Sequence, residues 1–166
     1  VNKLVVEKYL HVYGYLHGID WQVLRLANVY GPRQDPFGEA SVVAIFSQAA
    51  VDGREAVING DGEQTRDFIY VGDVCEAVLA LLNHEAEGIF NVGSGRETSI
   101  VTLARQIGEV HGQPLEVRHA PAKQGEQRRS AISAQRLQQA TGWQPRVELE
   151  QGLRHTLDFF RTHKEP

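Results

Sequence analysis

Methionine is absent from this 166-residue sequence, and cysteine occurs only once, at Cys75. A single cysteine excludes a disulfide within the chain and any cysteine-rich zinc site. Because Cys75 lies in an apolar helical pattern, we expect it to be a buried small hydrophobic residue. This cysteine usage fits a reducing compartment, so we expect a cytoplasmic protein. The sequence does not begin with methionine, and we therefore expect a truncated or incomplete product.

Long apolar runs and an excess of basic residues are missing as well. No stretch approaches the roughly 20 apolar residues of a membrane-spanning helix, and no signal-peptide pattern opens the chain. The net charge is -4 and the pI is about 6.0, which argues against a nucleic-acid footprint. We therefore expect neither a nucleic-acid nor a membrane partner. The seven histidines lack metal-ligand spacing and no serine has a nucleophile-elbow context, so neither a metal site nor a hydrolase triad is expected.

Hydrophobic periodicity predicts helices and strands that alternate along the whole chain, which is typical of the α/β class. The predicted helices cover residues 3–17, 40–51, 73–83, 100–110, 133–141 and a final segment from 149 onward. The predicted strands cover residues 21–26, 56–58, 67–71, 88–92 and 115–117. Apolar residues occupy more than one stripe of the first helix, so we expect that helix to be buried on two sides. Thr98 or Ser99 is the predicted N-cap of the helix that begins at residue 100. In the last helix, Leu149, Leu153, Leu157 and Phe160 share one face.

Four polar clusters stand out in these turn-rich segments: residues 28–33, 60–68, 93–95 and 123–129. The first follows a strand, where ligands of α/β proteins gather, although a Pro-Gly turn with a solvated arginine explains it equally well. In the second, a glycine-rich turn leads Arg66 into a strand and can present its forked guanidinium to a phosphate. A hairpin with a surface Arg66–Asp67 pair is the alternative there.

The other two clusters carry less information when composition alone is considered. Residues 123–129 have the composition of a solvated charged loop. Residues 93–95 lack the third glycine of the dinucleotide fingerprint, so they indicate an ordinary turn between a strand and a helix.

Taken in order, several short motifs give the chain a resemblance to a known family. They are Asn2-Lys3-Leu4, Leu24-Arg25, Asn28 to Gln34, Gly60-Asp61-Gly62, Arg66 to Val71, Phe90 to Gly93 and Gly142 to Pro145. The sequence resembles the extended short-chain dehydrogenase/reductase family of NAD-dependent nucleotide-sugar epimerases and dehydratases. Within it, the stretch from Ala27 to Ala40 is most similar to the UDP-glucose 4-epimerase branch.

The resemblance implies a fold in two parts. Residues 1–38 would be the end of the Rossmann-type NAD-binding domain, and residues 39–166 would mainly form the small α/β domain that binds the nucleotide sugar. The family's active-site tyrosine precedes a lysine by four residues, on one helix face. Matching that motif makes Lys3 the catalytic lysine and leaves the tyrosine outside this sequence.

Several further residues acquire roles from the resemblance alone. Lys3 would hold the nicotinamide ribose of NAD, and Ala27 would lie near the nicotinamide. Substrate-binding roles would fall to Asn28, Ser41, Val42, Asn59, Arg66, Lys123 and Glu126. Arg66 would pair with the diphosphate, while Lys123 and Glu126 would belong to a loop over the phosphate and nucleotide ribose. Asn59 stands where many relatives carry an aromatic residue that stacks on the base.

The implied activity is epimerisation of a UDP-hexose at C4 through a transient NAD-dependent 4-keto intermediate. Alternatives within the family are a nucleotide-sugar 4,6-dehydratase and a UDP-glucuronate decarboxylase. An alternative of another class is a non-catalytic domain that binds a nucleotide sugar or another protein. The resemblance also implies a homodimer built through the first helix, and we expect this fragment alone to be inactive.

Overall fold

The computed structural model describes residues 2–37 and 42–163 and confirms the α/β class. The helices are α1 (Asn2–His17), α2 (Val42–Asp52), α3 (Val71–Leu82), α4 (Ile100–His111), α5 (Gln135–Thr141) and α6 (Leu149–Thr162). The strands are β1 (Gln22–Leu26), β2 (Asn28–Tyr30), β3 (Ala56–Asn59), β4 (Thr65–Arg66), β5 (Phe68–Tyr70), β6 (Gly88–Val92), β7 (Thr98–Ser99) and β8 (Val117–Ala120). Most elements lie within a few residues of their predicted positions.

The strands form four two-stranded sheets. Three are parallel pairs, namely β1 with β6, β2 with β5 and β3 with β8, whereas β4 and β7 are antiparallel. A parallel pair needs a long crossover connection, so each pair joins segments that are distant in the sequence. The carboxyl ends of β1 and β2 therefore lie close to those of β6 and β5, and this positions the polar residues that follow them.

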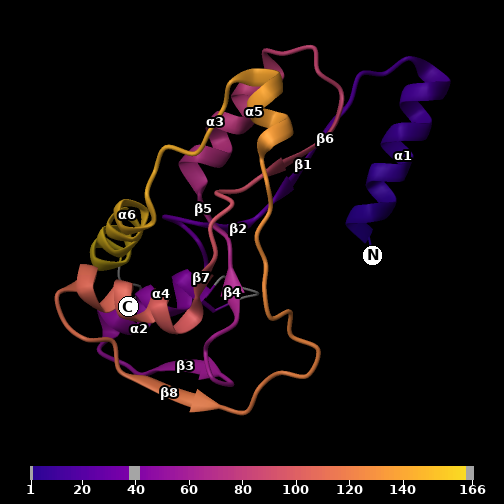
Figure 1. The fold of residues 1–166 in the computed structure, drawn as a ribbon. Helices are drawn as coiled ribbons and strands as arrows, with labels where there is room; N and C mark the ends of the chain where they lie inside the picture. Colours follow the sequence, from indigo (N-terminus) through magenta and orange to yellow (C-terminus); the bar gives the residue numbers. More distant parts are fainter. Residues whose placement is uncertain (1, 38–41, 164–166) are drawn as a thin grey trace.

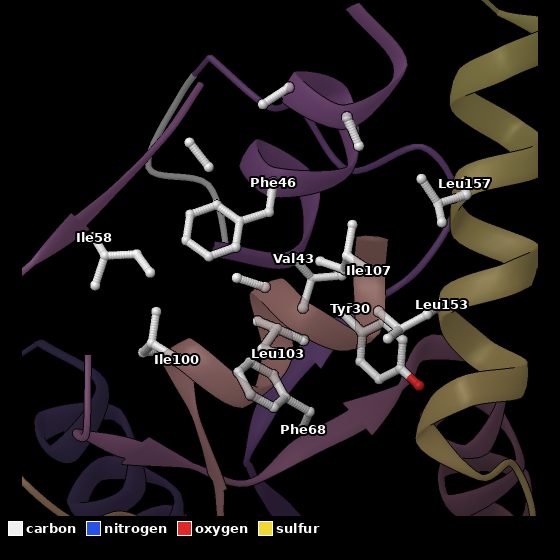
Figure 2. Packing of buried hydrophobic residues seen from close by; sticks show 14 residues of the cluster. Tyr30, Val43, Phe46, Ile58, Phe68, Ile100, Leu103, Ile107, Leu153 and Leu157 are labelled. Atoms are coloured by element: carbon white, nitrogen blue, oxygen red, sulfur yellow. The ribbon is translucent and has the colours of Figure 1, made fainter. Parts of the chain in front are cut away.

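Two hydrophobic clusters hold these elements together. The larger one packs α2, α4 and α6 around β2, β3 and β5, and its fully buried members include Tyr30, Phe46, Leu103, Leu153 and Leu157 (Figure 2). The smaller one lies where α3, α5 and β6 meet, toward the other end of the molecule (Figure 1). The described residues thus form two centres of apolar burial.

Local sequence signals account for the helix boundaries and the helix faces. Ser99, one of two predicted caps, accepts a hydrogen bond from the Thr102 amide at 3.2 Å, which satisfies an otherwise unpaired donor at the start of α4. Gly112 ends this helix in a left-handed conformation, with φ of 92°. In α6, Leu153, Leu157 and Phe160 are buried on one face, as their spacing predicted.

The prediction that α1 is buried on two sides is wrong for the described chain. None of its residues is buried, and the helix stands apart from the remaining elements (Figure 1). It is tied to the chain by the Glu7–Arg25 ion pair at 2.6 Å and by an edge contact between His11 and Trp21. An apolar helical stripe is buried only where another element covers it.

The prediction that Cys75 is buried is also wrong, because the thiol is exposed. Helix α3 buries Asp73, Ala77 and Leu81. At about 100° per residue, Cys75 lies on the opposite side of the helix from these residues. Within the described ranges 2–37 and 42–163, no helix has both the length and the apolar character of a membrane span.

Candidate functional site

The candidate site is organised by the turn between β3 and β4. Asn59 ends β3, and its carbonyl accepts a hydrogen bond from the buried Gln64 side chain at 3.0 Å. Gly62 has a φ of 78°, and a Cβ there would lie 3.0 Å from Ile58 Cγ2. Only glycine combines this conformation with so close an approach. The turn delivers Arg66 to the short strand β4, beside the exposed loop at residues 121–129.

The guanidinium of Arg66 is held by three hydrogen bonds. Its Nη1 donates to the carbonyls of Thr65 at 2.7 Å and Gln127 at 2.8 Å. Its Nη2 donates to Glu126 Oε1 at 2.9 Å, and the two side chains are only 17% and 28% exposed. The structure therefore brings two residues of the predicted site together, although 60 positions separate them in the sequence.

The hairpin considered for this segment, with a surface Arg66–Asp67 pair, does not form. Strand β3 pairs with β8, and β4 pairs with β7. Asp67 is 1% exposed. Its Oδ1 accepts from the Ser94 amide and hydroxyl at 2.9 and 2.7 Å, and its Oδ2 accepts from the amides of Gly95 and Ile132 at 3.0 and 3.2 Å. Asp67 thus joins β5 to the Gly93–Gly95 turn and to the segment that follows the charged loop.

The other predicted substrate residues surround this cluster to different extents. Lys123 lies in the same exposed loop, where its carbonyl accepts from the Glu126 amide at 3.3 Å. Asn28 begins β2, and its backbone amide donates to the backbone carbonyl of Asp67 at 2.9 Å. Asn28 therefore lies next to the strand that follows Arg66. Val42 begins α2 and packs half-buried against the larger core cluster. Ser41 lies outside the described residues.

The two residues predicted to bind NAD lie in another part of the structure. Lys3 is exposed in the first turn of α1, away from β4 (Figure 1). Ala27 follows β1, and its amide donates to the carbonyl of Val92 at 2.8 Å, at the end of β6. Dinucleotides bind beyond the carboxyl ends of parallel strands, and Ala27 lies at such an end. A G-x-G-x-x-G turn for the pyrophosphate does not occur in the sequence.

Sequence reasoning assigned no pairing to two carboxylates that face the charged loop, although Asp61 lies in the recognised cluster 60–68. Asp61 accepts two hydrogen bonds from Arg128, at 2.7 and 2.9 Å. Glu97 accepts two from Arg129, at 3.0 and 2.7 Å, and one from the Thr65 hydroxyl at 2.5 Å. The arginines were part of a recognised cluster, but their partners lie far away in the sequence. The loop is exposed, as its composition indicated, and it is also fastened to β4, to the β3–β4 turn and to Glu97 just before β7.

The contacts between Arg128 and Asp61 predict how the Asp61 carboxyl titrates. Hydrogen bonds from Arg128, followed by one from the Glu63 amide, lower the pKa of Asp61 to about 2. Because the pKa of Asp61 is lower in the folded protein, its ionised carboxylate stabilises the folded state at pH values above the ordinary pKa, which is near 4. This contribution is lost as the pH falls through about 2. In a carbon NMR titration, we expect the Asp61 midpoint to return toward the ordinary value in Arg128→Gln. An unchanged midpoint would contradict the pairing.

Comparison with known proteins places this geometry among nucleotide-sugar enzymes. A model of the NAD dependent epimerase/dehydratase family matches residues 1–93. The UDP-glucose 4-epimerase of Mycolicibacterium smegmatis is 43% identical over 165 residues, which cover 99% of this chain and 53% of that protein.

Two solved structures are similar to the chain over nearly its whole length. The UDP-glucose 4-epimerase of Thermotoga maritima with UDP-glucose matches with a TM-score of 0.93 at 41% identity, covering 96% of this chain and 52% of that one. The UDP-glucose 4-epimerase of Thermus thermophilus in complex with NAD matches with a TM-score of 0.85 at 44% identity, covering 93% of this chain and 51% of that one. The chain therefore spans about half the length of the relatives that it matches.

Proposed function

The chain belongs to the NAD-dependent epimerase/dehydratase family, and from that premise we propose that it is the substrate-binding half of an enzyme that epimerises a UDP-hexose at C4. Residues 1–38 complete the NAD-binding domain in this proposal, and residues 39–166 mainly bind the nucleotide sugar. The observation that carries it is the fixed guanidinium of Arg66, which lies with Glu126 and Lys123 beside the β3–β4 turn.

The diphosphate, the ribose and the base of the nucleotide each have a side chain suited to bind them in this proposal. Arg66 binds the diphosphate, because a planar guanidinium matches the phosphate oxygens better than a point charge does. The ammonium group of Lys123 adds positive charge from the loop. When Arg66 binds the diphosphate, Glu126 is free to accept hydrogen bonds from the ribose hydroxyls of the nucleotide. Asn59 lies near the nucleotide base.

The reacting end involves the residues that follow the parallel strands. Asn28 presents an amide to the sugar or its phosphate. Lys3 holds the nicotinamide ribose, and its positive charge favours the ionised form of a neighbouring phenol that takes the proton of the sugar hydroxyl. NAD, when bound, supplies reversible hydride acceptance at the sugar carbon, and Ala27 leaves room beside it.

The test is an assay of the full-length enzyme that contains this chain, with UDP-glucose and UDP-galactose as substrates. We expect interconversion in both directions without net consumption of NAD. Binding of NAD without interconversion would refute the proposal. Release of carbon dioxide from UDP-glucuronate would favour a decarboxylase, and loss of water from a dTDP-hexose would favour a 4,6-dehydratase. Tight binding of UDP-sugars by this chain without any turnover by the protein would favour a non-catalytic binding domain.

Substitution of Arg66 makes a separate prediction. Arg66→Lys keeps the positive charge but loses the fork that binds Glu126 and the carbonyls of Thr65 and Gln127. Charge-assisted hydrogen bonds contribute about 1.5–3 kcal/mol, so the loss of one raises the KM for the nucleotide sugar about tenfold. The kcat should stay within about threefold, because the diphosphate is remote from the reacting carbon. Arg105→Lys on the exposed face of α4 is the matched control, and equal KM values in the two variants would contradict the role of Arg66.

Assembly and location complete the proposal. We propose a homodimer that uses α1, whose exposed apolar side chains Leu4, Tyr9 and Leu16 suit an interface. A strictly monomeric protein in size-exclusion chromatography would count against it. This chain alone should be inactive, because the rest of the NAD site has no counterpart in its sequence. A cytoplasmic location suits the single free thiol of Cys75.

A further inference from the structure

The loop at residues 121–129 is held in place without a hydrophobic core of its own. Every one of its residues is exposed, so burial of apolar side chains does not hold it in place. Loops without buried apolar contacts belong to the least stable parts of a protein. This loop nevertheless carries Lys123 and Glu126, two of the residues proposed to bind the nucleotide sugar.

Ion pairs from two separate segments of the fold fasten the second half of the loop. Arg128 makes a two-pronged contact with Asp61 in the β3–β4 turn, and Arg129 makes one with Glu97 just before β7. Between these contacts, the Thr65 amide donates to the carbonyl of Arg128 at 2.9 Å. Two-pronged pairs of this kind fix orientation as well as distance.

The fastening points adjoin the residues that form the site. Glu126 and Gln127 immediately precede Arg128, and both accept hydrogen bonds from Arg66. A shift of the loop would therefore remove two of the three acceptors that orient the guanidinium of Arg66. The low pKa values of Asp61 and Glu97, each about 2, show that both carboxylates remain ionised over the whole physiological range.

We propose that Arg128 and Arg129 are positioning residues. By pairing with Asp61 and Glu97, they hold the charged loop in the place where Lys123 and Glu126 meet Arg66 and the diphosphate of the substrate. Neither arginine needs to contact the ligand. This inference rests on the proposed function, since it assigns residues that support the same site.

The first experiment reverses one ion pair in the protein. Arg128→Asp and Asp61→Arg, each alone, should raise the KM for UDP-glucose at least fivefold and leave kcat within twofold. The double variant, which restores opposite charges in reversed order, should return KM to within twofold of the wild type. The same pattern is expected for Arg129→Glu and Glu97→Arg. Restoration by the swap would show that the pairing itself, and not either side chain alone, determines KM.

An equally exposed ion pair provides the matched control. Arg105 and Glu109 on α4 are 62% and 58% exposed, against 62% and 56% for Arg128 and Asp61. Arg105→Glu and Glu109→Arg should leave KM and kcat within twofold of the wild type. If these variants raise KM as much as the loop variants do, a general change in surface charge explains the effect and the proposal is overturned.

Hydrogen–deuterium exchange provides a readout that does not depend on the substrate. The amides of residues 123–129 should exchange faster in Arg128→Asp and return to wild-type rates in the double variant. Unchanged exchange in the single variant overturns the proposal. So does faster exchange with an unchanged KM, because the fastening would then not position the site.

The two proposals fail in different ways. If the wild-type protein turns over no nucleotide sugar, the proposed function fails. The affinity for UDP, measured by calorimetry, then replaces KM in the same set of variants. Loss of affinity in the single variants with recovery in the swap would still support the positioning role. Absence of UDP binding to the wild type overturns both proposals.

Discussion

Asp67→Ala is expected to lower the free energy of unfolding by about 3–5 kcal/mol, because it removes the carboxylate that accepts four hydrogen bonds. The lost partners are the amides of Ser94, Gly95 and Ile132 and the hydroxyl of Ser94. A buried donor left without a partner costs about 1–3 kcal/mol. Water can reach the exposed Gly95 and offsets part of this cost, so the total stays below the sum of four full penalties.

Urea unfolding followed by circular dichroism would measure this loss. Asp67→Asn should have a smaller effect, because one carbonyl oxygen remains, although its amide group then faces amide donors. Asp158→Ala, at an exposed carboxylate of α6, is the control and should change the stability by no more than about 0.5 kcal/mol. A loss of less than about 1 kcal/mol in Asp67→Ala would mean that the four donors find other partners.

Gly152→Ala is expected to destabilise the protein by about 1–2 kcal/mol, although alanine is the better helix former. A Cβ at this position of α6 would lie 2.0 Å from the Tyr30 hydroxyl and 2.7 Å from its Cζ. In Figure 2, the Tyr30 hydroxyl points toward α6. The gain in helix propensity is about 1 kcal/mol, whereas overpacking a closely packed core costs about 1–3 kcal/mol or more. Tyr30 is 1% exposed and has little room to retreat, so the clash outweighs the gain.

Thermal unfolding of a double variant would isolate the cause. Tyr30→Phe removes the oxygen at 2.0 Å but leaves ring carbons at 2.7 and 2.9 Å. Gly152→Ala should therefore cost about 1 kcal/mol less in the Tyr30→Phe background than in the wild type. Gln151→Ala, at the exposed neighbouring position of the same helix, should be neutral or slightly stabilising. An equal cost of Gly152→Ala in both backgrounds would show that the hydroxyl contact is not the source.

Local patterns predicted the features that depend on neighbouring residues alone. The spacing of Leu153, Leu157 and Phe160 identified the buried face of α6, and Ser99 was recognised as a candidate cap of α4. Burial of Cys75 and α1 was predicted wrongly, because an apolar pattern does not say whether another element covers it. Helix α3 buries one face, and Cys75 lies on the other.

The candidate site was predictable only in part, for a related reason. Arg66 was recognised from a glycine-rich turn as a residue that can bind a phosphate, whereas its pairing with a diphosphate and the roles of Lys123 and Glu126 came from resemblance to a family. The contact between Arg66 and Glu126 bridges 60 positions, and no local pattern specifies it. The ion pairs of Asp61 and Glu97 were missed because a carboxylate in a polar segment does not reveal its partner until the fold brings an arginine to it.

The pairing of the strands also determines how this chain reaches its fold. Among the described residues, every strand pair joins distant segments, and even the pair with the smallest sequence separation joins Arg66 to Thr98. The entropy of loop closure must be lost before such pairs form, so a chain dominated by them has a high contact order and folds slowly. The β1–β6 pair cannot form on the ribosome until Val92 has left the exit tunnel. During synthesis, the β1–β6 pair therefore forms only after roughly sixty further residues have been added, a period of seconds at typical rates of elongation.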